Sequence, residues 1–199
     1  MLTLSINNYK NYKNIKTVLL AGKSGSGKTT TAEKLVQQMR FTKIITDTTR
    51  PMRPGEVNGV DYYFDTEDEF KRMISENKFA EYVDYDAAFG HVWYGSRTSE
   101  YTDQPNGNIA VAILNPFGVK TLLKKLDPQT TAVIYIDCPA DLRAGRLYAR
   151  GDDSREIERR LKTDETDFSD FAEISDIIIK PDRKSDPDTV VDCITKVLY

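Results

Sequence analysis

The sequence has few cysteines, no long apolar run and little net charge. Its 199 residues include only two cysteines, Cys138 and Cys193, which provide no disulfide framework and fit a reducing compartment. No segment approaches the ~20 consecutive apolar residues that cross a bilayer. The Asn-, Tyr- and Lys-rich residues 1–16 lack the apolar stretch of a secretion signal. We therefore expect a cytoplasmic protein with no membrane partner.

The positive and negative charges nearly cancel. Lys and Arg total 28 and Asp and Glu total 31, which leaves a formal net charge of −3. Because duplex-DNA binders carry a long polybasic face, this balance disfavours a nucleic-acid partner. The length and the hydrophobic content of 39% suit one compact domain with its own core. An anionic ligand would therefore have to be bound by a local group of cationic side chains.

Short apolar runs alternate along the chain with segments in which apolar residues recur at helical spacing. Strands and helices in this order form a parallel sheet flanked by helices, so the sequence predicts an α/β fold. Thr66 and Glu69 have the spacing of a capping box at the start of one helix. The predicted strands are 15–20, 44–46, 109–114, 131–136 and 177–179, with an extended segment at 60–64, and the predicted helices are 27–40, 66–77, 119–126, 141–150, 154–171 and 189–198.

Residues 22–29 match the P-loop pattern G-x-x-x-x-G-K-[ST] and lie between a predicted strand and a predicted helix. Glycines allow successive backbone N–H groups to point at a phosphate, and the following helix adds its positive N-terminus. Lys28 would bring a full charge to the transferred phosphate, and Thr29 would bind Mg²⁺ through its hydroxyl. The predicted ATP-binding residues are Gly22, Ser24, Gly25, Ser26, Gly27, Lys28, Thr29 and Thr30.

A P-loop indicates a nucleoside triphosphate but not the reaction, because GTPases, ATPase motors and small-molecule kinases share it. The chain has no Asn-Lys-x-Asp stretch with which a Ras-like switch reads its base. It is also too short for a motor with its additional machinery. Both observations count against those two classes.

The loop that follows the P-loop helix carries two arginines, Arg50 and Arg53, between prolines. Guanidinium groups bind phosphate oxygens in a bidentate manner, so two of them on a stiff loop can converge on one phosphate. Tyr62 could add a phenolic donor. We therefore predict a second anion site here, with solvated surface charges as the alternative interpretation.

Residues 46–64, TDTTRPMRPGEVNGVDYYF, resemble the guanylate kinase signature T-T-R-x-P-R-x-G-E-x-x-G-x-D-Y. Residues 78–82, KFAEY, and 94–96, YGS, resemble two further elements of that family, and the pattern can be followed from about residue 15 to residue 179. The resemblance implies a P-loop NTPase fold with three parts: a core at 15–47, 98–140 and 165–199, a monophosphate-binding lobe at 48–97, and a lid at 141–164.

The resemblance also implies the roles of individual residues. Arg50, Arg53, Tyr62 and Tyr94 match the residues that hold the monophosphate, and Thr46, Glu81 and Ser96 match those that read guanine. A carboxylate suits guanine because its N1–H and 2-amino groups are adjacent donors, whereas adenine has no such pair. The predicted catalytic residues are Lys28 and the lid arginines Arg146, Arg150 and Arg160.

The implied activity is direct in-line transfer of the γ-phosphate of Mg·ATP to GMP or dGMP, giving ADP and (d)GDP, in a monomer or a homodimer. Two other functions stay open. One is a kinase of another monophosphate such as dTMP, against which Glu81 counts. The other is a non-catalytic guanylate-kinase-like binding module, against which the complete P-loop counts.

The chain departs from the family pattern where that pattern has two acids, [DE]-I-D-x-Q-G. Ile113-Leu114-Asn115 stands there instead, and Asn115 brings no negative charge. The segment 82–93 is longer than in the family and adds Asp84, Asp86 and His91. We hypothesise that Asp84 or Asp86 partly replaces the missing acids, and we interpret His91 as a loop residue rather than a general base.

A further departure follows the last predicted strand. Lys180-Pro181-Asp182 stands where the family tends to have an Asn-Asp pair near adenine. How this chain recognises the donor base is therefore left open by the sequence.

Overall fold

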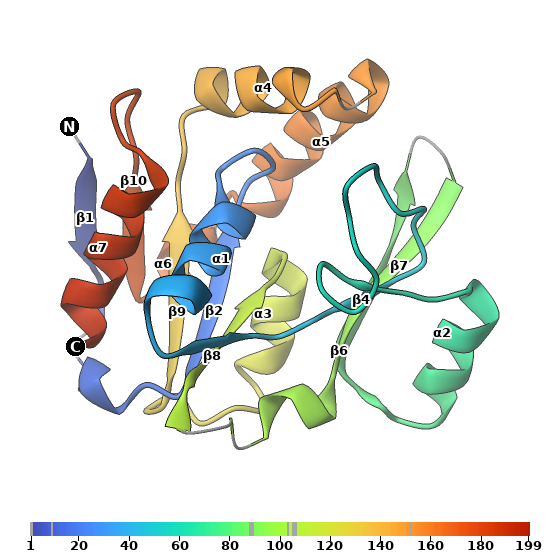
Figure 1. Cartoon of the computed structure of the whole chain (residues 1–199), viewed down its shortest axis with the longest axis horizontal. Helices are drawn as coiled ribbons and strands as arrows, with labels where there is room; N and C mark the ends of the chain where they lie inside the picture. The colour runs from blue at the N-terminus through green and yellow to red at the C-terminus, as the bar shows by residue number, and fades with distance from the viewer. Residues whose placement is uncertain (1, 9, 88–89, 103, 105–106, 152) are drawn as a thin grey trace.

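The computed structural model describes residues 2–8, 10–87, 90–102, 104, 107–151 and 153–199. It contains two sheets that lie side by side (Figure 1). The larger sheet has the strand order β1-β10-β9-β2-β8-β3, in which β1 is antiparallel to β10 and the other neighbours are parallel. Its strands are β1 (Thr3–Ile6), β2 (Thr17–Gly22), β3 (Phe41–Lys43), β8 (Ile109–Ile113), β9 (Thr131–Ile136) and β10 (Ile177–Lys180).

Helices cover both faces of the larger sheet because its central strands are apolar on both sides. Val18 and Leu20 of β2 face α1 (Lys28–Gln38) and α7 (Pro187–Leu198). Leu19 and Ala21 face the opposite side, where α3 (Pro116–Leu122) and α6 (Phe171–Ile174) pack. This is the predicted α/β arrangement of a mostly parallel sheet flanked by helices, and the prediction is confirmed.

The smaller sheet has the order β5-β4-β7-β6. Its two longest strands, β6 and β7, form an antiparallel pair that the sequence did not predict. Helix α2 (Glu67–Ser75) covers one side, begins with the predicted Thr66–Glu69 capping box, and packs Phe70 on Phe79 with ring centroids 4.4 Å apart. The strands are β4 (Asp47–Thr48), β5 (Tyr63–Phe64), β6 (Phe79–Ala87) and β7 (Gly90–Arg97).

The remaining helices, α4 (Ala140–Ala149) and α5 (Ser154–Asp167), cross above the carboxyl end of the larger sheet (Figure 1). Short 3-10 turns occupy Tyr12–Asn14 and Thr98–Tyr101. Among the residues that the structure describes, no helix combines the length and the apolar character that spanning a bilayer requires.

Several element boundaries differ from the sequence-based expectations. The strand expected at 44–46 lies at 41–43, and Ile44 follows it as a buried residue whose N–H still donates to Val111. The helix expected at 119–126 is α3, which begins earlier because Asn115 caps its N-terminus and Pro116 suits its first turn. The helix expected at 154–171 is two helices, α5 and α6, separated at the buried Phe168.

The larger sheet also includes β1, upstream of the expected core boundary at residue 15. Lys10 ties this segment to the core, because its Nζ donates to Asp176 Oδ2 at 2.7 Å and to the backbone oxygen of Thr131 at 2.6 Å. Asp176 is 5% exposed and also accepts from the Val133 N–H at 2.8 Å. A buried carboxylate therefore depends on a lysine close to the N-terminus.

We expect Lys10→Ala to lower the free energy of unfolding by about 3–5 kcal/mol at pH 7, because it leaves the carboxylate of Asp176 buried without a cation. Urea unfolding measures the change. Lys13→Ala, at an exposed neighbour, is the matched control and should stay within about 0.5 kcal/mol of the parent protein. Equal losses in the two variants would show that the ion pair does not anchor the segment.

Candidate active site

The P-loop lies between the carboxyl end of β2 and the first turn of α1, as predicted. Gly25 and Gly27 have φ angles of 76° and 99°, in the left-handed region that favours glycine. A Cβ on Gly25 would lie 2.6 Å from the backbone oxygen of Arg143. The N–H of Ser24 donates to Asp164 at 2.7 Å. The loop is therefore held against both α4 and α5.

Lys28 is the predicted catalytic cation of this loop. Its Nζ donates to the backbone oxygens of Gly22 at 2.5 Å and Lys23 at 3.1 Å. Burial, together with nearby arginines and against the opposing effect of Asp164, lowers the pKa of Lys28 to about 8. The ammonium group is thus poorly solvated among positive charges, an environment that favours an anion beside it.

The second group of cations lies on the loop after β4. Arg50 is 3% exposed and forms two bonds with Glu56, from Nη1 to Oε2 at 2.7 Å and from Nη2 to Oε1 at 2.5 Å. The Arg53 N–H donates to the same carboxylate at 2.8 Å. The Arg50 guanidinium carbon also lies 4.8 Å from the ring centroid of Tyr62. These contacts fix the direction in which the guanidinium points.

Glu81 is a buried carboxyl group on β6. Its Oε1 accepts from Ser96 Oγ at 2.6 Å, and Ser96 Oγ accepts from the Tyr101 hydroxyl at 2.9 Å. Its Oε2 lies against Gly118 of α3, where a Cβ would approach to 2.8 Å. Burial raises the pKa of Glu81 to about 7, although Ser96 and Lys125 act in the opposite direction.

Helix α5 adds two arginines whose guanidiniums share one buried carboxylate. Glu156 is 4% exposed and accepts from Nε and Nη2 of Arg159, each at 2.9 Å, and from Nε of Arg160 at 2.6 Å. One carboxylate thereby positions two cations on the face of α5 that lines the cavity.

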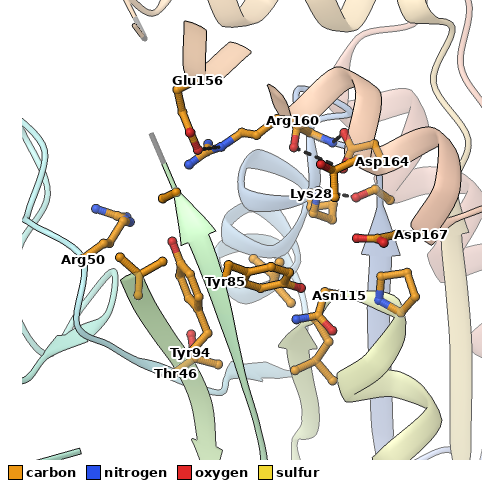
Figure 2. A pocket seen from close by; sticks show the side chains of 18 of the residues that line it. Lys28, Thr46, Arg50, Tyr85, Tyr94, Asn115, Glu156, Arg160, Asp164 and Asp167 are labelled. Atoms are coloured by element: carbon orange, nitrogen blue, oxygen red, sulfur yellow. Dashed lines mark hydrogen bonds and ion pairs between the residues drawn. The ribbon is translucent and has the colours of Figure 1, made fainter. Parts of the chain in front are cut away.

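A single cavity joins these groups (Figure 2). Arg50 and Tyr94 lie on one side of it, Lys28 lies on the other, and Tyr85 projects between them. The cavity therefore brings the two predicted anion sites together. The predicted residues that line it are Gly22, Ser24, Lys28, Thr46, Arg50, Arg53, Tyr62, Glu81, Tyr94 and Arg160.

Other predicted site residues lie elsewhere. Ser96 contacts the cavity only through Glu81. Ser26, Gly27, Thr30 and Arg146 line a second cavity between the start of α1 and the loop after β10, and Arg146 Nη1 lies 3.3 Å from the backbone oxygens of Gly25 and Ser26.

Thr29 and Arg150 are exposed at the start of α1 and the end of α4. Neither lines the two cavities described here, and the same holds for Gly25. The charge of Arg150 nevertheless contributes to the lowered pKa of Lys28.

The hypothesis that Asp84 or Asp86 replaces the missing acids is wrong. Side chains alternate along β6, so Glu81, Tyr85 and Ala87 line the cavity whereas the two aspartates project from the opposite face. There they contact the imidazole of His91, Asp84 at Nε2 (3.2 Å) and Asp86 at Nδ1 (3.0 Å). His91 belongs to β7 rather than to a loop.

Sequence reasoning missed several charged residues of the site. Asp164 and Asp167 of α5 line the cavity with Arg159. Their spacing of four and seven residues from Arg160 places them on the same face of a helix, so helical periodicity could have found them. Arg143 was missed as well; it is 1% exposed and pairs with Asp164 and Glu165.

Comparisons with known proteins agree with this geometry. The family model "Guanylate kinase" matches residues 14–194. A guanylate kinase of Neisseria gonorrhoeae is 30% identical over 176 residues, which cover 85% of this chain and 84% of that protein. One from Novosphingobium aromaticivorans is 34% identical over 70% of this chain and 62% of its own length. The crystal structure of guanylate kinase from Anaplasma phagocytophilum matches 92% of this chain and 84% of its own, with a TM-score of 0.67 and 25% identity.

The raised pKa of Glu81 predicts a pH effect on stability. The folded protein holds a proton on this group up to about pH 7, whereas the unfolded chain releases it near pH 4.3, so this group's contribution to stability falls as the pH rises between those values. Glu81→Gln, which cannot ionise, should therefore stabilise the protein at pH 8 by on the order of 1–3 kcal/mol and have little effect at pH 4. Thermal unfolding at both pH values checks this, and an effect that does not depend on pH would contradict it.

Proposed function

The chain belongs to the guanylate kinase family, and on this premise we propose how its cavity phosphorylates GMP with ATP. The observation that carries the proposal is that a P-loop lysine and an arginine–tyrosine group line one cavity from opposite sides. Two phosphate groups bound there would face each other, which suits direct in-line transfer. Most of the catalysis then comes from positioning and charge stabilisation.

We assign the monophosphate to the side formed by Arg50, Arg53, Tyr62 and Tyr94. Arg50 stays oriented by Glu56 while its remaining N–H groups and the tyrosine hydroxyls are available to phosphate oxygens. On the opposite side Lys28, Arg159 and Arg160 surround the phosphoryl group that moves. Their charges stabilise the oxygens of this group in the transition state.

Glu81 is the residue that selects guanine. When it is ionised, its two oxygens can accept from N1–H and from the 2-amino group, and Ser96 and Gly118 hold it in place. Thr46 lines the same cavity and offers a hydroxyl. Adenine offers acceptor and donor in a different order, so the same carboxylate disfavours AMP.

The residues also fit a Mg²⁺ ion that arrives with ATP. Among the described residues, no group of three or more His, Cys, Asp or Glu side chains forms a metal cage. Mg²⁺ prefers one or two protein oxygens together with phosphates and waters, so Thr29 with few carboxylates suits it. When bound, the ion neutralises charge on the β- and γ-phosphates.

We propose that the second cavity takes the nucleoside end of ATP, with Arg146 beside it. It adjoins Ser26, Gly27 and Thr30 of the P-loop, and Pro181 and Ser185 form its opposite wall.

The segments 48–97 and 141–164 would then close on the two nucleotides as lobe and lid, which excludes water from the reaction. One chain lines the site, so a monomer suffices, and a cytoplasmic location matches these substrates.

An assay with ATP and a panel of monophosphates tests the function. We expect ADP to form with GMP and dGMP and to form at least about 100-fold more slowly with AMP, CMP and dTMP, because those bases cannot donate to Glu81 as guanine does. Equal rates with dTMP would make the protein a kinase of another specificity. Binding of ATP without ADP formation would favour a non-catalytic binding module.

Lys28→Ala should lower kcat by about 10²–10³-fold, because it removes a charge that acts on the transferred group. Lys34→Ala is the matched control, because Lys34 lies on the same helix and pairs with Asp188 at the surface. Its kcat should equal that of the parent protein. A Lys28 variant that retains the parent rate would refute a catalytic P-loop.

Gly118→Ala should raise the KM for GMP about tenfold while the KM for ATP stays within about twofold, because a new Cβ displaces the Glu81 carboxylate. Gly145→Ala, on α4, adds a Cβ where nothing lies within 4 Å and should change neither constant. Steady-state kinetics measures all four values. An unchanged KM for GMP in the first variant would mean that Glu81 does not contact the base.

A further inference from the structure

Among the described residues, four acidic side chains line the cavity, and three of them accept a hydrogen bond that orients them. Glu81 accepts from Ser96, Glu156 from Arg159 and Arg160, and Asp164 from the N–H of Ser24. In the part of the chain that the structure describes, no hydrogen bond or ion pair reaches the carboxylate of Asp167. A half-buried carboxylate inside a cationic cavity is therefore available to a ligand.

Asp167 occupies a fixed position beside the P-loop. It ends α5, and the next residue, Phe168, is buried and stacks on Tyr135 of β9 with ring centroids 5.5 Å apart. Figure 2 shows its carboxylate between Lys28 and Asp164 on one side and Asn115 on the other. The core sheet therefore anchors this end of the helix even if its other end moves.

Within the described part of the chain, the neighbouring strands bring no other acid to this place. P-loop enzymes hold Mg²⁺ with the loop Ser or Thr and with an Asp that follows a neighbouring strand. Here β8 ends at Ile113, and Asn115 behind it already accepts from the Gly118 N–H at 2.8 Å. Asp137 after β9 pairs with Lys180 at 3.2 Å and does not line the cavity.

The charges around Asp167 also favour a bound cation. Burial and the neighbouring charge of Asp164 raise its pKa, and only Arg159 opposes them. Burial and a neighbouring negative charge destabilise the ionised form of this carboxyl group. A cation brought into the cavity would therefore stabilise it strongly. The donor nucleotide supplies such a cation, because ATP binds as its magnesium complex.

We propose that Asp167 is the acidic residue that faces the divalent cation of the metal–ATP complex, where it binds the cation directly or accepts hydrogen bonds from the waters bound to it. The proposal rests on the proposed function and deepens it: the negative charge for the metal comes from α5 rather than from the end of a sheet strand. Asp167 then helps to position the metal, and Lys28, Arg159 and Arg160 act on the phosphates.

Metal binding tests the proposal without turnover. Mn²⁺ replaces Mg²⁺ as a paramagnetic probe, and the β,γ-imido analogue of ATP replaces ATP, so that electron paramagnetic resonance gives the Kd of Mn²⁺ in the complex. We expect Asp167→Asn to raise this Kd about 10-fold or more, as the loss of metal-orienting carboxylates does elsewhere. The affinity for the analogue without metal should stay the same or increase, since a negative charge near the phosphates is removed.

The matched control is Glu158→Gln, an exposed acid on the same helix that does not line the cavity. It should leave the Mn²⁺ Kd unchanged, and circular dichroism should show both variants folded. A Kd within about twofold of the parent in Asp167→Asn would overturn the proposal. So would an Asp167→Asn variant that changes only the KM for GMP, because Asp167 would then face the acceptor nucleotide.

The outcome is separate from that of the proposed function. If the parent protein phosphorylates GMP but the Kd of Mn²⁺ is unchanged in Asp167→Asn, only this inference fails. If Mn²⁺ binding depends on Asp167 but no monophosphate is phosphorylated, the kinase function fails and the metal-facing role of Asp167 stands.

Discussion

The concentration of positive charge in one cavity is the constraint on which the rest of the structure depends. Lys28, Arg50, Arg53, Arg159 and Arg160 all line it. Such groups repel one another, and acceptors hold Lys28, Arg50, Arg159 and Arg160 in place. Glu56 holds Arg50, Glu156 holds the pair on α5, and backbone oxygens hold the lysine. The cations are thus oriented before phosphates arrive, which is how electrostatic preorganisation lowers a barrier.

Helix α5 connects the parts of this arrangement. Two arginines near its middle line the cavity, Asp164 accepts from the Ser24 N–H of the P-loop, and Phe168 stacks on Tyr135 of β9. Arg143, buried beneath it, bonds to the Cys138 and Ser24 oxygens as well as to Asp164 and Glu165. A movement of this helix would therefore also shift the P-loop.

Sequence patterns predicted those parts of the structure that are determined by residues close together in the chain. The glycine spacing of the P-loop, the capping box at Thr66 and the arginine loop each specify their own geometry. The sequence did not reveal β1, because its four residues are exposed and show no alternation of burial. Asp167 shares a helix face with Arg160, seven residues earlier, and this spacing is the signal in the sequence that points to it. The alternation along β6 places Asp84 and Asp86 on the face opposite Glu81, but the sequence did not predict this strand.

The central claim is that ATP and GMP bind at the same time with their phosphates facing each other across one cavity. A molecule in which adenosine and guanosine are joined by four or five phosphates tests it most directly, with calorimetry giving its Kd. The account predicts that it binds at least about 100-fold more tightly than ATP or GMP alone, because linking two compatible sites makes the second binding event intramolecular. A compound that binds no more tightly than ATP, together with direct competition between ATP and GMP, would contradict the account.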